Sequence, residues 1–394
     1  MFKREIKSKL IRSFGDEARI FHLLEEMKKE TKEGEVVYDF TIGSPDGIPN
    51  DEVIETMQNA VASKNSHRYA GKWGNKTFNE AVSKFYKTRY GVDLDPKKEV
   101  IPIAGAKRAI IDMSVNFVNE GRGVLLPNMC YPTYRIGAQI ARATQCEYRL
   151  NPEDDFKPIY EDLDRSDCDM IYLNYPHNPT CSYGGMDVFD QVVMLAKKNN
   201  YIVCHDNAYG EIVFDNREPI SFLQSNGAKD VGVEIFTFSK VFDLAGWRIA
   251  CIVGNPEIVH AYGASLVDYT TGVYTPIQLS GAKALELFFD KEVHEKQSAK
   301  YQERRDVVVN GLNEKGWKCF NSQGSIYVWA KLPVKDSVEF TKRLWEEKRV
   351  LITPGITYGP ALGSYVRLAL VSDVNNLKKA IENIPDTSSL MYDC

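Results

Sequence analysis

Residues 234–248 read EIFTFSKVFDLAGWR, a short apolar strand that ends in two hydroxyl residues and a lysine. The amine of Lys240, placed at a strand end, can form a Schiff base with an aldehyde. The hydroxyls of Thr237 and Ser239, together with Arg248 eight residues after the lysine, can bind a dianionic phosphate. Pyridoxal 5'-phosphate (PLP) carries both groups, so the stretch predicts a site for this cofactor. The alternative is an ordinary surface lysine after an edge strand.

The composition is that of an ordinary globular protein, and its charge excludes some classes of partner. The chain has 394 residues, of which 43% are hydrophobic and 26% charged, so it can bury a large core. The formal net charge is −5, and there is no long basic block. No apolar stretch approaches the length of a membrane-spanning helix. We therefore expect neither nucleic acid nor a membrane as a partner.

The cysteines and the first residues of the chain indicate a compartment. The eight cysteines are scattered and form no CxxC pair, so we expect no metal site. Scattered thiols in a chain of this length fit a reducing compartment better than a disulfide scaffold. Residues Met1–Lys7 lack the apolar run of a signal peptide. We therefore expect a cytoplasmic protein.

Short apolar runs alternate with helical patterns through the middle of the chain. One helical pattern places Phe189, Val192, Val193 and Ala196 at i, i+3, i+4 and i+7. Alternation of this kind predicts βαβ units and a mostly parallel sheet with helices on both faces. The six apolar runs are Val100–Ile103, Val124–Leu126, Met170–Leu173, Tyr201–Cys204, Ile235–Phe238 and Ile249–Val253.

The pattern changes after about residue 285. A charged helix, a strand, a second helix and a second strand follow, which predicts a smaller α+β domain. We expect a large domain at residues 46–285 and a small domain formed by residues 1–45 and 286–394. The four later elements are expected at Lys291–Asn313, Ser325–Ala330, Val338–Lys348 and Tyr365–Leu370.

Polar or glycine-rich residues follow five of the six apolar runs. Ligands of open α/β sheets bind outside the carboxyl ends of the strands, so one crevice collects all of these groups. The groups are Gly105-Ala106-Lys107, Pro127–Tyr134, Asn174–Thr180, His205-Asp206-Asn207 and Ser239-Lys240.

Asp206, Asn178 and Tyr209 are the candidates to hold the pyridine ring of PLP. A carboxylate beside the ring nitrogen favours the protonated ring, because an opposite charge stabilises a charged group. Asp206 suits this task, and the alternative is that it caps a following helix. Asn178 and Tyr209 can donate hydrogen bonds to the ring oxygen, which lowers the pKa of the imine. The alternative for Asn178-Pro179 is a plain turn.

The phosphate and the face of the ring have further candidates. The backbone N–H groups of Ala106 and Lys107 open a helix after Gly105, and helix N-termini favour anions. These groups would complete a phosphate site with the two hydroxyls and the arginine named above. Tyr131 can stack on the π-deficient ring, and the alternative is a core aromatic residue.

These residues match a known family in the order in which its motifs occur. The chain closely resembles the class I and II aminotransferases of fold type I, and among them the branch of the LL-diaminopimelate, alanine and aspartate aminotransferases. The resemblance spans nearly the whole chain. Its remaining segments are Ile42–Asp46, Tyr69–Gly71, Asp206–Tyr209, Ser239–Arg248, Pro276–Gln278, Gly324–Trp329, Thr353–Gly355 and Val366–Leu368.

The resemblance implies a fold and a reaction. The fold is α/β, with a large, mostly parallel α/β/α sheet domain that binds PLP and a smaller α+β domain. The reaction is the transfer of an amino group from an L-amino acid to a 2-oxo acid by a ping-pong mechanism. Lys240, Asp206 and Tyr209 are then the catalytic residues, with Lys240 as the Schiff-base lysine and proton carrier.

The resemblance also implies substrate-binding residues and an oligomer. Arg367 matches the arginine that binds the substrate α-carboxylate, for which bidentate geometry is suited, and Asn178 belongs to the same site. Gly43 matches a glycine where the backbone closes over the substrate. Tyr69 matches a tyrosine that reaches the phosphate bound by the neighbouring subunit. We therefore expect a homodimer with shared active sites.

One loop departs from the family pattern. The family has a glycine after Asn-Pro-Thr, whereas this chain has Cys181. We expect this change to affect the backbone angles of the loop more than the chemistry of the site. We interpret His177, in the same loop, as structural. His205 either positions Asp206 or points to the opposite face of its strand.

Two other functions would use parts of the same pattern. Another PLP reaction type, such as a β-lyase, a synthase or an amino-acid oxidase, would need the same site residues. A regulator that senses an amino acid on this fold would carry an added DNA-binding domain, for which we expect no room before Ile42.

The sequence leaves the side chain of the substrate open. Lys107 at the start of its helix, and Lys72 in the loop expected from the other subunit, would favour a dicarboxylic amino acid such as glutamate or aspartate. The alternative is that Lys107 contributes only its backbone N–H and Lys72 is solvated. A bulky loop with Trp73 would instead admit a larger or aromatic side chain.

Overall fold

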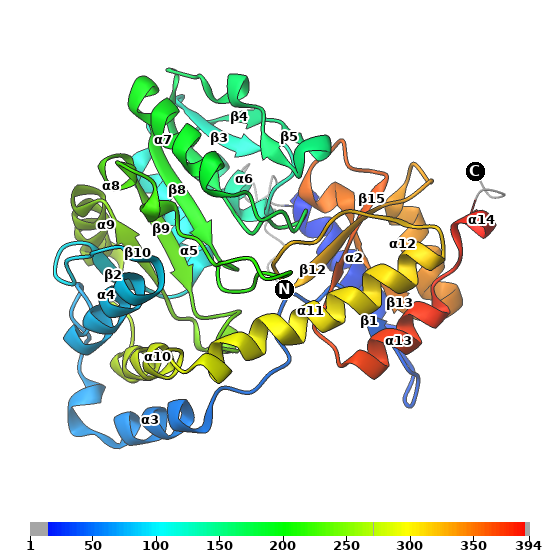
Figure 1. The fold of residues 1–394 in the computed structure, drawn as a ribbon, viewed down its shortest axis with the longest axis horizontal. Helices are drawn as coiled ribbons and strands as arrows, with labels where there is room; N and C mark the ends of the chain where they lie inside the picture. Colours follow the sequence, from blue (N-terminus) through cyan, green and yellow to red (C-terminus); the bar gives the residue numbers. More distant parts are fainter. Residues whose placement is uncertain (1–14, 271, 391–394) are drawn as a thin grey trace, which may run out of the picture.

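The computed structural model describes residues 15–270 and 272–390, so the expectation about a signal peptide at Met1–Lys7 lies outside the described residues. Within these ranges, two β-sheets of different size lie at opposite ends of the long axis (Figure 1). The larger sheet uses strands between residues 100 and 254, and the smaller one uses strands between residues 318 and 369.

The larger sheet has seven strands in the order β2-β10-β9-β8-β7-β3-β4. Strand β10 runs antiparallel to both of its neighbours, and the remaining pairs are parallel. The mostly parallel α/β sheet that we expected is therefore confirmed. The strands span β2 Val100–Ile103, β3 Gly123–Pro127, β4 Thr144–Tyr148, β7 Cys168–Leu173, β8 Ile202–Asn207, β9 Gly232–Thr237 and β10 Ala250–Gly254.

Each of the six predicted apolar runs overlaps a strand, because strands buried on both faces carry continuous apolar side chains. Strand β4 was not predicted from the sequence. It lies at the edge of the sheet and reads TQCEY, with only two of its five residues buried. An edge strand with polar side chains carries little of the apolar signal that marks a central strand.

Two hydrophobic cores lie on the two faces of this sheet. Side chains on a strand alternate between faces, so Leu125 and Ile171 join one core while Val124 and Met170 join the other. Helices α4 and α7 contribute to the first core, and α5, α6 and α9 to the second. The large-sheet helices are α3 Asp51–Ala62, α4 Lys76–Tyr90, α5 Ala106–Phe117, α6 Pro132–Ile140, α7 Met186–Asn199, α8 Ala228–Val231, α9 Pro256–Tyr269 and α10 Thr275–Leu287.

The smaller sheet is antiparallel and has the order β11-β12-β15-β14. Its strands are β11 Lys318–Cys319, β12 Tyr327–Lys331, β14 Thr353–Pro354 and β15 Tyr365–Ala369. A parallel pair of short strands, β1 Tyr38–Asp39 and β13 Val350–Leu351, lies beside it. The helices here are α2 Gly15–Lys29, α11 Lys291–Glu314, α12 Ser337–Lys348, α13 Val374–Asn383 and α14 Thr387–Leu390.

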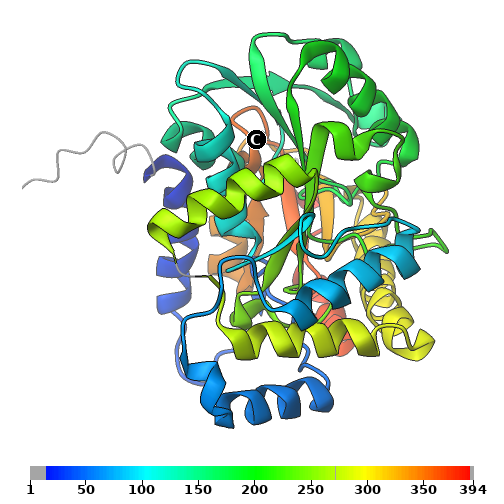
Figure 2. The same cartoon turned by 90° about the vertical axis from the view of Figure 1, so that its left-hand side faces the viewer.

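The two sheets are joined by two chain crossings. One is the segment between β1 and α3, and the other runs from α10 into the long helix α11 (Figure 1). Helix α3 packs along α10 at the outer end of the large-sheet part (Figure 2). The arrangement agrees with the order of elements that the sequence predicts, and the domain division at residues 46–285 stays a prediction.

Candidate functional site

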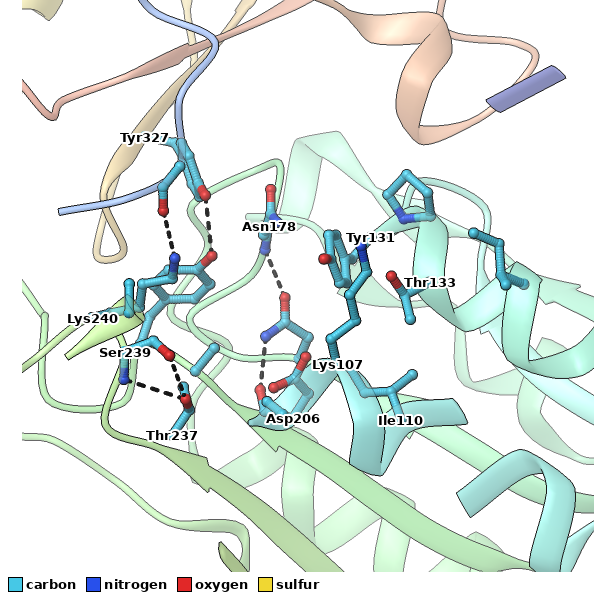
Figure 3. A pocket seen from close by; sticks show the side chains of 18 of the residues that line it. Lys107, Ile110, Tyr131, Thr133, Asn178, Asp206, Thr237, Ser239, Lys240 and Tyr327 are labelled. Carbon is cyan, nitrogen blue, oxygen red and sulfur yellow. Dashed lines mark hydrogen bonds between the residues drawn. The ribbon is translucent and has the colours of Figure 1, made fainter. Parts of the chain in front are cut away.

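A cavity of about 740 Å³ lies between the carboxyl ends of the large-sheet strands and the smaller sheet. In Figure 3, Lys240 and Tyr327 lie on one side of this cavity, Lys107, Tyr131 and Thr133 on the other, and Asn178 and Asp206 between them. Twelve predicted site residues line it: Gly43, Ala106, Lys107, Tyr131, Asn178, Asp206, Tyr209, Thr237, Ser239, Lys240, Arg248 and Arg367.

Lys240 follows β9, which lies between β8 and β10, so the edge-strand alternative is wrong. The amine donates a hydrogen bond to the carbonyl oxygen of Gly43. Burial lowers the pKa of the Lys240 ammonium, although the phenol of Tyr327 partly opposes the shift. A lysine in this environment is more often neutral than a surface lysine, and the neutral amine is the nucleophilic form.

Asp206 lies at the end of β8, and its two carboxylate oxygens differ. Oδ2 accepts a hydrogen bond from the Tyr134 hydroxyl at 2.7 Å, whereas Oδ1 is buried and has no partner among the described residues. Burial raises the pKa of the carboxyl to about 6, in spite of the bond from Tyr134. Strand β8 continues through Asn207 and no helix begins there, so the helix-cap alternative is wrong.

Asn178 and Tyr209 lie within reach of the same space as Asp206. The backbone N–H of Asn178 donates to Asn174 Oδ1 at 2.8 Å, which fixes the loop against the sheet. The Tyr209 hydroxyl donates to the hydroxyl of Tyr327 at 3.2 Å. Both residues are buried and both line the cavity, as the two predicted donors to a ring oxygen require.

The groups predicted to bind a phosphate also meet. Gly105 precedes α5 with φ +88°, and a β-carbon there would lie 2.3 Å from Nη2 of Arg248. Glycine is therefore needed both for the turn and for the approach of the guanidinium. The hydroxyl of Thr237 donates to that of Ser239 at 3.0 Å, and both side chains are buried at the cavity wall.

Arg367 is a buried cation that contacts uncharged acceptors. Nη1 donates to Asn178 Oδ1 at 3.1 Å and Nη2 to the carbonyl oxygen of Thr41 at 3.3 Å. Nε has no acceptor among the described residues. The guanidinium carbon lies 3.9 Å from the ring centre of Tyr327 and 5.1 Å from that of Tyr358. A buried cation without an anionic partner predicts an anionic ligand.

Four further residues at the site were not predicted from the sequence: Tyr327, Tyr134, Thr41 and Phe21. Tyr327, Thr41 and Phe21 line the cavity, and Tyr134 holds Asp206. Tyr134 and Tyr327 lay inside segments that carried the resemblance, which is the one signal that pointed to them. Phe21, on α2, carried no motif and is placed at the cavity only by packing.

Tyr69, Lys72 and Trp73 lie away from this cavity in the described subunit. The Tyr69 side chain is 88% exposed. Trp73 stacks on His260 with ring centres 5.3 Å apart, and the Lys72 ammonium lies 5.1 Å from the Trp73 ring centre. Lys107 is exposed and lines the cavity. Trp73 therefore does not shape this chain's own cavity.

The loop around Cys181 keeps the backbone conformation that a glycine would have. Cys181 has φ +65°, in the left-handed region that favours glycine. Its thiol donates to the carbonyl oxygens of Tyr327 at 3.1 Å and of Pro179 at 3.3 Å. These contacts stabilise the thiol in the interior, so the substitution leaves the loop intact.

The two histidines near the site do not line the cavity. Nδ1 of His177 shares a hydrogen bond with Thr180 Oγ1 at 2.8 Å, and burial lowers the pKa of His177 to about 3. His205 binds Glu234 at 2.8 Å on the face of β8 opposite Asp206. It therefore does not position the Asp206 carboxylate by a direct bond.

One cluster of potential metal ligands lies far from the cavity. Cys146, Asp167 and Cys168 bring their ligand atoms within 4.8 Å of one another. Arg165 already pairs with Asp167 at 2.6 Å and donates to Cys146 Sγ at 3.6 Å. The guanidinium fills the position of a cation, so the cluster does not change the expectation of no metal.

The residues at the cavity fit PLP on several independent points. Asp206 Oδ1 is a buried acceptor with no partner among the described residues, as a protonated ring nitrogen requires. The half-buried ring of Tyr131 faces the cavity opposite Lys240 (Figure 3). The N-terminus of α5, the hydroxyl pair and Arg248 gather at one end, as a phosphate requires.

Comparison with known proteins gives a consistent result. Residues 35–384 match the family described as aminotransferase class I and II. Glutamate-pyruvate aminotransferase AlaC of Escherichia coli is 35% identical over 93% of this chain and 90% of its own. LL-diaminopimelate aminotransferase of Halothermothrix orenii is 34% identical over 90% of this chain and 92% of its own. Substrate-bound BacF of Bacillus subtilis superposes with a TM-score of 0.91 at 31% identity, covering 96% and 97% of the two chains.

Among residues 15–270 and 272–390, no helix combines the length and the apolar character needed to cross a membrane.

Proposed function

Since this chain belongs to the class I and II aminotransferase family, we propose that its cavity is the active site and that the twelve residues named above bind PLP and substrate. The protein is a PLP-dependent aminotransferase of fold type I. The observation that carries the site assignment is that Lys240, Asp206 and Arg367 meet in one cavity, although they come from different elements.

The roles follow from the environment of each residue. When bound, PLP would supply the aldehyde carbon that takes up the amino group and the electron sink for the bond broken at the substrate α-carbon. Lys240, with its lowered pKa, would take the proton from the substrate α-carbon and deliver it to the cofactor carbon that receives the amino group. Asp206 would hold the ring nitrogen through its unpartnered Oδ1, and Tyr209 would donate to the ring oxygen. Arg367 binds the substrate α-carboxylate with its remaining donors.

The assignment of Lys240 has a direct test. Purified protein loaded with PLP is reduced with borohydride, digested and analysed by mass spectrometry. The expected result is a pyridoxyl group on the Lys240 peptide, and no such adduct in Lys240→Ala protein. Lys107→Ala serves as the matched control, since it removes a neighbouring amine of the same cavity. A pyridoxyl group on another lysine contradicts the assignment.

Amino-group transfer, rather than a β-lyase, synthase or oxidase reaction, is the activity of the named relatives. Loaded enzyme given an amino donor alone should accumulate pyridoxamine phosphate in amounts stoichiometric with active sites. Release of pyruvate with ammonia, or consumption of oxygen, would instead indicate one of the other reaction types.

We also propose a homodimer with shared active sites. Tyr69 is exposed and lies outside its own subunit's cavity, as expected of a residue that serves the partner's phosphate. Tyr69→Phe protein mixed with Lys240→Ala protein should regain activity in hybrid dimers. A fully active monomer in sedimentation experiments would contradict the proposal.

For the substrate, we propose a dicarboxylic amino acid as one partner of the exchange. Lys107 supports this, because it is a cation on the cavity wall with no hydrogen-bond or ion-pair partner among the described residues. It belongs to the same chain as the rest of the cavity, so its position does not depend on a second subunit. The relatives include a glutamate-pyruvate aminotransferase. A panel of amino donors with 2-oxoglutarate as acceptor tests the idea. If Lys107→Ala leaves the ratio of dicarboxylic to neutral donor rates unchanged, the proposal is wrong.

A cytoplasmic location remains part of the proposal. The described cysteines are all free thiols, and six of the seven are buried, as suits a reducing compartment. Cell fractionation with the protein tagged at its C-terminus is the appropriate test.

A further inference from the structure

Tyr327 lines the cavity on the same side as Lys240 (Figure 3) and has no role in the function proposed above. It begins β12 in the smaller sheet, and its side chain is buried. Its hydroxyl meets the Tyr209 hydroxyl at 3.2 Å, and its ring lies 3.9 Å from the guanidinium carbon of Arg367. One side chain therefore contacts the residue assigned to the cofactor ring oxygen and the residue assigned to the substrate carboxylate.

We propose that Tyr327 is a positioning residue with two separable actions. Its hydroxyl orients and polarises Tyr209, and its aromatic face supports Arg367. The inference rests on the roles proposed for Tyr209 and Arg367.

The hydroxyl of Tyr327 is confined by its neighbours. A β-carbon at Gly43 would lie 2.5 Å from Tyr327 Oη, so the glycine provides the space that the hydroxyl occupies. The carbonyl oxygen of Gly43 accepts the hydrogen bond from Lys240 Nζ. The rings of Tyr209 and Tyr327 meet edge to face, with centres 5.8 Å apart at 74°. The hydroxyl therefore has little room to turn away from Tyr209.

The charges around the two phenols make Tyr327 the better donor. Burial raises the pKa of Tyr327, but the positive charges of Arg367 and Lys240 outweigh burial and bring its pKa below the ordinary value. Burial, reinforced by Tyr327, holds the pKa of Tyr209 well above the ordinary value. When the Tyr209 hydrogen points to the PLP ring oxygen, Tyr327 can donate to the Tyr209 oxygen. Hydrogen bonds in such a chain strengthen one another.

The ring of Tyr327 acts on Arg367 separately from the hydroxyl. A guanidinium over an aromatic face is attracted by the ring quadrupole, and the attraction is largest where water is excluded. Arg367 is 5% exposed and its direct acceptors are the uncharged atoms of Asn178 and Thr41. The Tyr327 ring therefore supplies the electron-rich surface that keeps this buried cation in place before a carboxylate arrives.

Two substitutions separate the actions. Tyr327→Phe keeps the ring and removes the hydroxyl, and Tyr327→Leu removes both. In the PLP-loaded protein, the pH midpoint of the cofactor's visible absorption should rise by about 1 unit in Tyr209→Phe and by about 0.3 unit in Tyr327→Phe. The dissociation constant of 2-methylalanine, an amino acid without an α-proton, should stay within about twofold in Tyr327→Phe and rise about 10-fold in Tyr327→Leu.

A double-mutant cycle tests whether the hydroxyl acts through Tyr209. Adding Tyr327→Phe to Tyr209→Phe should give no further shift of the pH midpoint, because the Tyr209 hydroxyl through which Tyr327 acts has already been removed. Tyr201→Phe is the matched control, since it removes a buried phenol hydroxyl outside the cavity and should leave the midpoint unchanged. The cycle uses only Tyr→Phe variants. It therefore tests whether the Tyr327 hydroxyl acts on Tyr209 even if the Tyr327→Leu protein does not fold.

The outcomes distinguish this inference from the proposed function. A pyridoxyl adduct away from Lys240 in the wild-type protein overturns the proposed function itself. If the adduct is on Lys240 and Tyr209→Phe shifts the midpoint, but Tyr327→Phe does not or shifts it equally in both backgrounds, only the hydroxyl action is overturned. Wild-type affinity for 2-methylalanine in a folded Tyr327→Leu protein overturns the action on Arg367.

Discussion

Asp206 and Glu234 are buried carboxylates on the neighbouring strands β8 and β9, yet their surroundings differ. Glu234 accepts hydrogen bonds from five groups, which belong to Tyr86, Asn207, His205, Ser221 and Phe222. Asp206 accepts one side-chain bond and leaves Oδ1 without a partner among the described residues.

The difference appears in their acidities. Burial raises the pKa of both carboxyls, but His205, Tyr86 and Asn207 bring the pKa of Glu234 below its ordinary value, whereas the pKa of Asp206 stays raised, at about 6. Burial of a charged group is therefore not by itself a sign of function. A buried acceptor that faces a cavity with unused capacity is the sign, because folding alone gives no reason to leave it unpaired.

The largest expected effect is on catalysis at the unpaired carboxylate. Asp206→Asn should lower kcat/KM about 10³-fold, because an amide cannot stabilise a positive charge on the ring nitrogen. The same change should not lower the free energy of unfolding of the PLP-free protein, because it removes a buried charge that lacks full compensation. Steady-state kinetics measure the loss of activity, and urea unfolding measures the stability of the PLP-free protein. A destabilised PLP-free Asp206→Asn protein would contradict the contrast between Asp206 and Glu234.

The opposite pattern is expected for Glu234. Glu234→Gln should lower the free energy of unfolding by about 3 kcal/mol, because the new NH₂ group must face groups that are themselves donors. Activity per folded molecule should change less than about fivefold. Glu314→Gln, an exposed exchange of the same kind, should stay within about 0.5 kcal/mol. Equal losses of unfolding free energy in Glu234→Gln and Glu314→Gln would mean that the hydrogen bonds to Glu234 do not stabilise the fold.

The unfolding free energy of the wild-type protein should depend on pH in a way that the unfolding free energy of Asp206→Asn does not. The Asp206 carboxyl has a folded-state pKa of about 6 against an ordinary 3.8, so the fold binds its proton more tightly than the unfolded chain does. Its stabilising contribution is complete below pH 3.8 and is lost as the pH rises to about 6. Wild-type apo protein should lose about 2–3 kcal/mol relative to Asp206→Asn across this window. Urea unfolding at several pH values measures it, and parallel curves would contradict the assigned pKa.

The smallest effect is expected at Cys181, where a buried polar group is satisfied. Cys181→Gly relieves a left-handed backbone angle, which is worth about 1 kcal/mol, and gives up the buried contacts of the thiol. The two terms oppose each other, so stability should change by less than about 1 kcal/mol. Activity should stay within about threefold of the wild type. A loss of activity beyond tenfold would show that the thiol is part of the site.

The sequence was informative where function and fold are encoded locally. The six apolar runs identified six strands of the large sheet, and the motifs correctly placed Asp206 at the end of one strand and Lys240 just after another. The edge strand β4 was missed because its side chains are mostly polar. Tyr69, Lys72 and Trp73 do not line the cavity, so the proposed roles of these three residues were not tested within the described chain.

By itself, the sequence determined the mostly parallel sheet, the lysine at the end of β9 and the carboxylate at the end of β8. These depend on side-chain periodicity and on neighbours within a few residues. The tertiary structure alone decided that Tyr327 contacts Tyr209, 118 residues away in the sequence, and that Arg367 contacts Asn178, 189 residues away. It also decided which carboxylate has an unused oxygen. The physical reason is that hydrogen-bond satisfaction and burial belong to the assembled interior, where distant segments compete for the same donors.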